Sequence, residues 1–182
     1  VISKGEFVVE VDKKWAPIGA ERLYDLARQN YFDGIRFFRV IPGFMAQFGI
    51  SGNPAANAYF ENKNIPDEPV TLSNTRGMVT FAHGGPGTRG TQLFINFGDN
   101  SNLDHDGSSG FPPVGKVVEG MEVVDQINGQ YGEMPGHIQG EMTARGNAIL
   151  DAQYPGLDEI VRVELIEPAP AAASAAETPK EE

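Results

Sequence analysis

The sequence predicts a mainly β domain in which short antiparallel strands close into a barrel. Short runs rich in β-branched and aromatic residues recur along the chain, and Gly, Pro and Asn separate them. Only two segments have the clear apolar spacing of a helix. At 182 residues, of which 40% are hydrophobic, the chain is long enough for one domain with its own core. It has no cysteine, which excludes disulfides and thiolate zinc sites.

The first two elements follow from local patterns. Residues 6–11 alternate and are β-branched, which is typical of a strand. Pro17 is expected to begin a helix, because the N–H that proline lacks would be unpaired in a first turn anyway. Leu23, Leu26 and Ala27 then provide the apolar stripe that lays this helix on the sheet.

The later elements are expected from similar signals. Further strands are predicted at 36–41, 45–50, 78–82, 93–97, 113–118 and, closing the domain, 160–166. A second short helix is predicted at 119–127, with Met121, Val124 and Ile127 facing inward.

Two segments have weaker patterns. Residues 129–157 are less regular, with a helical turn expected near 147–152, and we interpret them as a surface elaboration that contacts a partner or simply packs on the domain. The domain is expected to span residues 1–167. The Ala/Pro/Glu-rich tail, 168–182, is expected to be disordered.

Charge and composition exclude several classes of partner. A net charge of −11 argues against nucleic acids and anionic membrane surfaces, and no apolar run approaches the length of a membrane span. The chain starts at Val1 rather than methionine, as expected if a leader has been removed. Together with the tail, this favours an exported or periplasmic bacterial protein over a cytoplasmic one, and we expect a monomer.

One arginine lies in an otherwise apolar run, residues 37–49. The only strongly polar side chains there are Arg39 and Gln47. A guanidinium keeps its proton inside a protein, so it needs water or a partner. Arg39, Ile41, Met45 and Gln47 all have odd numbers, so strand alternation places them on one face. A cation, an amide and apolar surface together suit peptide binding; the alternative is an ordinary amphipathic strand with a surface arginine.

This run is the first of three blocks that resemble the cyclophilin-type peptidyl-prolyl isomerases. It reads Phe-Phe-Arg-Val-Ile-Pro-Gly-Phe-Met-Ala-Gln-Phe-Gly, and the other blocks are 77–96 and 113–121. The blocks occur in the family's order and, with their flanks, cover residues 5–163. The resemblance implies an eight-stranded barrel capped by two helices, with the active site on its outer surface.

The resemblance also implies an activity, rotation about X–Pro peptide bonds to assist protein folding. Such a catalyst needs no nucleophile, general base, metal or cofactor, only a pocket for the proline ring and a donor that favours the twisted amide. The resemblance assigns catalysis to Arg39, with Gln47 in an assisting role. The substrate-binding residues that it implies are Phe44, Met45, Ala82, His83, Gln92, Phe94, Asn102, Leu103 and Phe111.

Four positions depart from the family pattern. Phe38 replaces a frequent histidine, His83 an asparagine, and Phe111 a histidine of the proline pocket. Asn102 stands where a tryptophan associated with cyclosporin binding is expected, so cyclosporin should bind weakly at most. The expected partners are proline-containing peptides and unfolded or partly folded proteins.

Other motifs are weaker. The acidic segment 99–107 resembles a calcium loop, but Leu103 and Gly110 stand where oxygen ligands are required, so we expect a surface loop. The glycine-rich segment 84–90 lacks the Lys-Ser/Thr ending of a phosphate cradle. No metal-ligand spacing relates the three histidines, His83, His105 and His137.

Two functional hypotheses remain, an active prolyl isomerase and a catalytically weak proline-binding module that acts as a chaperone or scaffold. The presence of Arg39 favours the enzyme. The changes at Phe38 and Phe111 and the added segment 129–157 are the best support for the binding module.

Overall fold

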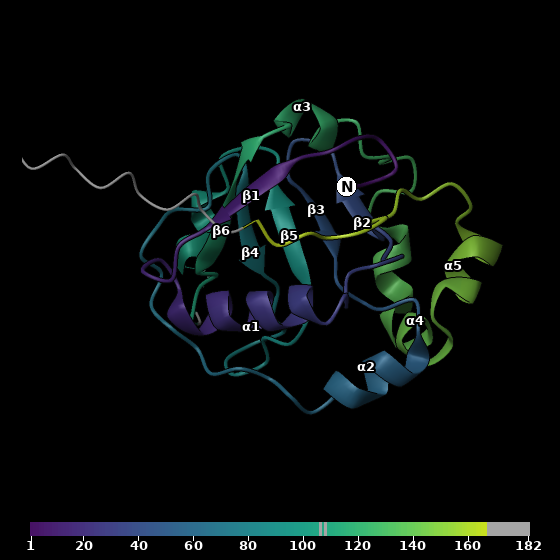
Figure 1. Cartoon of the computed structure of the whole chain (residues 1–182), viewed down its shortest axis with the longest axis horizontal. Coiled ribbons are helices and arrows are strands. Elements are labelled where there is room, and N and C mark those ends of the chain that lie inside the picture. Colours follow the sequence, from purple (N-terminus) through teal and green to yellow (C-terminus); the bar gives the residue numbers. More distant parts are fainter. Residues whose placement is uncertain (106, 108, 167–182) are drawn as a thin grey trace, which may run out of the picture.

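The computed structural model describes residues 1–105, 107 and 109–166, and the expected disordered tail lies outside this part of the chain. One antiparallel sheet forms its centre, with the strand order β1-β6-β4-β5-β3-β2 (Figure 1). The strands are β1 (Val8–Val11), β2 (Arg39–Ile41), β3 (Met45–Phe48), β4 (Met78–Phe81), β5 (Leu93–Asn96) and β6 (Pro113–Glu119).

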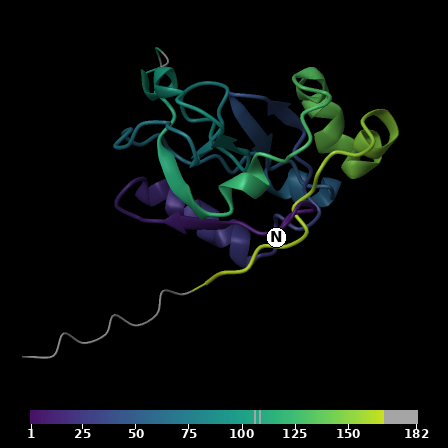
Figure 2. The same cartoon turned by 90° about the horizontal axis from the view of Figure 1, so that it is seen from above.

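Helices lie around this sheet in two groups. Figure 1 shows α1 (Pro17–Arg28) and α3 (Met121–Val124) at opposite ends of the sheet. The helices α2 (Pro54–Phe60), α4 (Gln139–Arg145) and α5 (Asn147–Gln153) gather beside it, as the view from above also shows (Figure 2). Two 3₁₀ helices are η1 (Ser101–His105) and η2 (Met134–Ile138).

The element count differs from the expectation. Within the described residues there are six strands rather than eight, and five α-helices rather than two. The predicted strand 160–166 is wrong: isolated bridges form only at Glu159 and Ile160, and beyond them Val161 is already 46% exposed. The helix predicted at 119–127 shortens to α3, because Gly120 adopts a left-handed conformation (φ 77°) and the helix begins after it.

Strand alternation divides the sheet into an inner and an outer row. Paired positions on β2, β3, β5 and β4 form each row. The inner row packs with α1 in the main core and consists of Val40, Ala46, Ile95 and Val79. The outer row consists of Arg39, Gln47, Phe94 and Thr80. The expectation from odd numbering is therefore confirmed, since Arg39 pairs directly with Gln47, and Ile41 with Met45.

A buried ion pair fixes the start of α1. Ala16, the residue before the helix, offers no capping side chain. The Glu68 carboxylate instead accepts the N–H groups of Ile18 and Gly19, each at 2.9 Å. Arg89, only 1% exposed, donates to the same carboxylate at 2.8 Å and to the Pro66 carbonyl. A side chain distant in sequence thus satisfies backbone donors that every helix start leaves open.

The segment 129–157, called the extension below, is attached to the sheet by a second, smaller core. Its buried residues Met142, Ile149 and Leu150 pack against Phe38 and Ile50. Phe38 is 1% exposed and immediately precedes β2. The extension therefore packs on the domain, which was one of the two interpretations from the sequence, and the phenylalanine at this position fills the core beneath it.

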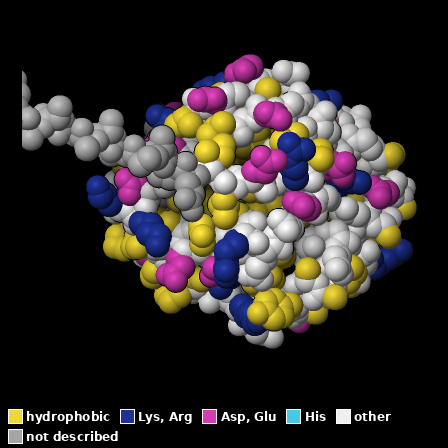
Figure 3. Space-filling model, viewed as in Figure 1, with side chains coloured by type: hydrophobic (Ala, Val, Ile, Leu, Met, Phe, Trp, Pro, Cys, Tyr) yellow, Lys and Arg dark blue, Asp and Glu magenta, His cyan; other side chains and the backbone are white. Residues whose placement is uncertain are grey.

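The surface on the side of α1 carries both signs of charge. Figure 3 shows acidic and basic side chains interspersed over this face, so the net charge of −11 forms no single-sign patch there. No helix in the described part of the chain is both long and apolar enough to cross a membrane.

Candidate active site

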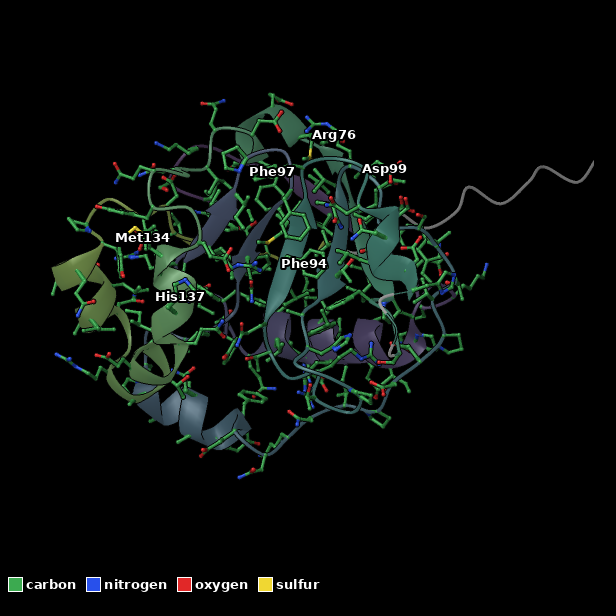
Figure 4. The ribbon with its side chains drawn as sticks, turned by 180° about the vertical axis from the view of Figure 1, so that it is seen from behind. Arg76, Phe94, Phe97, Asp99, Met134 and His137 are labelled. Atoms are coloured by element: carbon green, nitrogen blue, oxygen red, sulfur yellow. The ribbon has the colours of Figure 1, made fainter. Side chains whose placement is uncertain are left out.

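Three residues of the outer row, Arg39, Gln47 and Phe94, line a pocket of about 250 Å³. In the view from behind, Phe94 lies near the middle of the molecule, and Met134 and His137 of the extension lie to its left (Figure 4). The lining residues are Arg39, Phe44, Met45, Gln47, Ala82, His83, Phe94, Leu103, Phe111, Glu133, Gly136 and Gln139.

The structure brings together nine of the eleven residues that the sequence predicted for the site. Gln92 lines an adjoining pocket of about 380 Å³ and touches the first through its hydrogen bond to Gln47. Asn102 is exposed on η1 and does not line either pocket. The predicted set is therefore spatially coherent apart from Asn102.

Arg39 is held from two sides. Its Nε donates to Glu133 Oε1 at 2.8 Å, and its Nη1 donates to Gln47 Oε1 at 3.1 Å. The Gln47 amide donates in turn to Gln92 at 2.8 Å, and Gln92 to Gln139 at 3.0 Å. A chain of side-chain amides thus extends from the guanidinium through Gln47 on β3 and Gln92, just before β5, to Gln139 of the extension, and it orients the cation at the pocket wall.

The apolar floor of the pocket is built from aromatic rings. Phe94 and Phe111 meet edge to face with centroids 5.9 Å apart, and His83 stacks on Phe111 at 4.0 Å. His83 Nδ1 accepts the Gly85 N–H, which assigns its proton to Nε2 and makes Nε2 the donor to the Gly110 carbonyl at 2.9 Å. Two hydrogen bonds therefore fix the orientation of the imidazole, which stacks on Phe111.

A layer of buried amides lies beneath the floor. Asn100 donates to the Phe44 carbonyl and Asn74 to the Phe111 carbonyl, each at 2.8 Å. Asp104 accepts both the backbone and side-chain N–H of Asn74, at 2.8 Å. The segment 99–107 is thus more than the surface loop that the sequence suggested, because its carboxylate fixes the backbone of a pocket phenylalanine.

This network makes part of the stability depend on pH. Partial burial acts to raise the pKa of Asp104, but hydrogen bonds from Ser73 and Asn74 outweigh it, so the pKa lies below its ordinary value. A lowered pKa contributes stability above the unfolded value of about 3.9, and this contribution is lost as the pH falls through the folded pKa. We expect Asp104→Asn to destabilise the protein at pH 7 and by clearly less at pH 3, as measured by urea unfolding. An equal loss at both values would contradict the assignment.

The sequence did not predict three of the lining residues, all of them in the extension: Glu133, Gly136 and Gln139. No local pattern marks them as members of a site. The only available signal was indirect: a large apolar residue at Phe38 implies that another segment packs over the edge of β2.

The family model for the cyclophilin type peptidyl-prolyl cis-trans isomerase/CLD matches residues 1–147. Peptidyl-prolyl cis-trans isomerase A of Dickeya dadantii (strain 3937) is 36% identical over 141 residues, covering 75% of this chain and 73% of that protein. Peptidyl-prolyl cis-trans isomerase-like 3 of Rattus norvegicus is 33% identical over 126 residues, covering 68% and 76%.

The fold has a counterpart among solved structures. A cyclophilin type peptidyl-prolyl cis-trans isomerase of Cryptosporidium parvum matches with a TM-score of 0.60 at 21% identity, covering 72% of this chain and 85% of that chain. At this identity the likeness shows the fold alone, while the family model and the curated relatives carry the assignment. On their evidence the chain belongs to the cyclophilin-type peptidyl-prolyl cis-trans isomerases.

Proposed function

We propose that this peptidyl-prolyl cis-trans isomerase carries out its reaction in the pocket on the outer row of the sheet. The observation that carries the proposal is the fixed guanidinium of Arg39 at the edge of an aromatic floor. The floor, with Phe94 and Phe111, suits the apolar proline ring. The guanidinium can donate a hydrogen bond to the prolyl nitrogen, which becomes a better acceptor as the amide twists.

Amide resonance creates the barrier, roughly 18–20 kcal/mol, and neither planar isomer needs to form or break a bond to cross it. Twisting ends the conjugation and leaves a lone pair on the prolyl nitrogen. A donor aimed at that nitrogen stabilises the twisted amide more than either planar form, which is the condition for catalysis. Arg39 is the proposed donor. Its Nε and Nη1 are engaged, and within the described residues Nη2 has no hydrogen-bond partner, which leaves it for the substrate.

Proline-containing peptides are the proposed substrates, in unfolded or partly folded proteins as well as in short segments. A related solved structure supports this class: the Cryptosporidium parvum cyclophilin was determined in the presence of the dipeptide Ala-Pro, and it matches this chain with a TM-score of 0.59 at 20% identity. We also propose weak binding of cyclosporin at most, since Asn102 adds no surface to the pocket, and a monomeric protein.

We further propose that the six-stranded sheet closes into a barrel. The support is a pair of isolated bridges, Ile2 to Ile160 and Arg36 to Glu159. They link residues 159–160 to the segments that precede β1 and β2, the two edge strands of the sheet. The ion pair between Arg36 and Glu159 reinforces this junction.

A protease-free NMR exchange measurement on a short X-Pro peptide tests the activity. The protein should accelerate cis–trans exchange, which takes tens to hundreds of seconds unaided. A peptide with alanine in place of proline serves as the control for binding. Saturable binding of the proline peptide without acceleration would instead favour the proline-binding module.

A further inference from the structure

The extension supplies a carboxylate to the guanidinium at the centre of the site. Glu133 lies 94 residues after Arg39, and its Oε1 accepts the Arg39 Nε–H at 2.8 Å. The arginine side chain is 26% exposed and that of the glutamate 48%. In this setting an ion pair contributes little to overall stability, so its position against the pocket requires another explanation.

The backbone of the extension also packs directly on the arginine. A Cβ at Gly136 would lie 3.2 Å from Arg39 Cδ, so the glycine lets η2 approach the aliphatic stem closely. Just before η2, the Gly132 carbonyl accepts the Val40 N–H at 3.3 Å and ties the extension to β2 beside Arg39. The carboxylate is therefore presented from a segment fixed to the same strand.

The middle of the extension is anchored as well. Met142, on α4, is 1% exposed and packs with Phe38, the residue next to Arg39. Gln139, the first residue of α4, is the last member of the amide chain that runs from Gln47 through Gln92. The extension thus reaches the guanidinium by two routes, directly through Glu133 and indirectly through Gln139.

We propose that Glu133 is a positioning residue for Arg39, an inference that rests on the catalytic role proposed for that arginine. A guanidinium held at one atom can turn about that bond, whereas bonds at both Nε and Nη1 fix its plane. Fixing the plane before the substrate arrives directs Nη2 toward the pocket. It also reduces the side-chain entropy that a flexible arginine would lose on binding the twisted amide of the substrate. Glu133 does not touch the reacting atoms and acts only through the arginine.

The test compares Glu133→Ala, which removes both the charge and the acceptor, with Glu133→Gln, which removes the charge but keeps an acceptor. Loss of one charge-assisted hydrogen bond should lower kcat about tenfold in the alanine variant and leave KM within about twofold. The glutamine variant should recover most of the loss. Glu141→Ala is the matched control, because Glu141 lies in the same extension and, among the described residues, its ion pair is with the surface Arg145.

A spectroscopic readout separates positioning from general damage. The Arg39 Nε–H resonance, identified by its absence in Arg39→Lys, should exchange slowly with water in the wild type and in Glu133→Gln, and rapidly in Glu133→Ala. Unfolding midpoints should be similar in all of these variants, since the pair is partly exposed.

Three outcomes would overturn the proposal: unchanged kcat in Glu133→Ala, a higher kcat in that variant, or a glutamine variant as impaired as the alanine one. A different result would overturn the proposed function instead, namely full turnover in Arg39→Ala. The two failures are therefore distinguishable in the same set of proteins.

Discussion

Replacing Arg39 by alanine is expected to lower turnover by about 10²-fold or more, the usual effect of removing a preorganised donor aimed at developing charge. Peptide binding should change far less, because the aromatic floor around Phe94 and Phe111 remains. The expected signature is therefore a fall in kcat with nearly constant KM, measured by NMR exchange at several peptide concentrations. Unchanged turnover would exclude this mechanism.

Arg39→Lys sharpens the experiment. Lysine keeps the charge but lacks the planar fork that bonds Glu133 and Gln47 at the same time. We expect it to remain well below the wild type, which would show that orientation matters in addition to charge. Arg28→Ala is the control, because Arg28 is 64% exposed at the end of α1 and, within the part of the chain that the structure describes, its ion pair is with Asp25.

The largest effect on stability is expected from Arg89→Met. Arg89 is 1% exposed, and its removal leaves the Glu68 carboxylate buried without its cation. Breaking one partner of a buried pair typically costs about 3–5 kcal/mol of unfolding free energy. We expect the lower end, about 3 kcal/mol, because two N–H groups of α1 still bond the carboxylate.

Urea unfolding of single and double variants tests this reasoning. Adding Glu68→Gln to Arg89→Met should restore part of the loss, because the buried charge is then gone. Arg145→Met is the control, since its pair with Glu141 is more than half exposed and should contribute under about 1 kcal/mol. A loss in Arg89→Met as small as in this control would show that the pair does not stabilise α1.

The central hairpin and its functional face could be predicted because their information is local. Arg39 and Gln47 are eight residues apart, and a turn at Pro42–Gly43 with two-residue alternation is enough to place them opposite each other. The distant apolar members of the site could be placed only through the resemblance, since Phe94, Leu103 and Phe111 reach the pocket from later parts of the chain.

Helix α2 was not predicted from the sequence, for a different reason. The residues around its start, Ser51-Gly-Asn-Pro54, look like a turn, and the sequence analysis assigned no element there. The same residues form a helix start, with Asn53 accepting the Ala55 N–H and Pro54 in the first turn. Turn and helix-start signals use the same residue types, and only the alanine-rich stretch that follows distinguishes them.

Glu133 could not be predicted from its surroundings. It is one of 25 acidic residues, and its partner is 94 positions away. What determines its role is the docking of the extension, which depends on a core shared between Phe38 and two later helices. Packing of this kind over a long sequence separation leaves no periodic trace in the chain.

Phe38 and Arg39 are neighbours in the chain, yet one lies in the small core under the extension and the other lines the pocket. A local opening that releases α4 and α5 would therefore disengage the guanidinium while the main core around Val40 and Ile95 stays folded. Local openings of this kind need less free energy than global unfolding. On warming, we expect activity to be lost before the sheet melts, so the thermal limit of the enzyme is set by its smaller core.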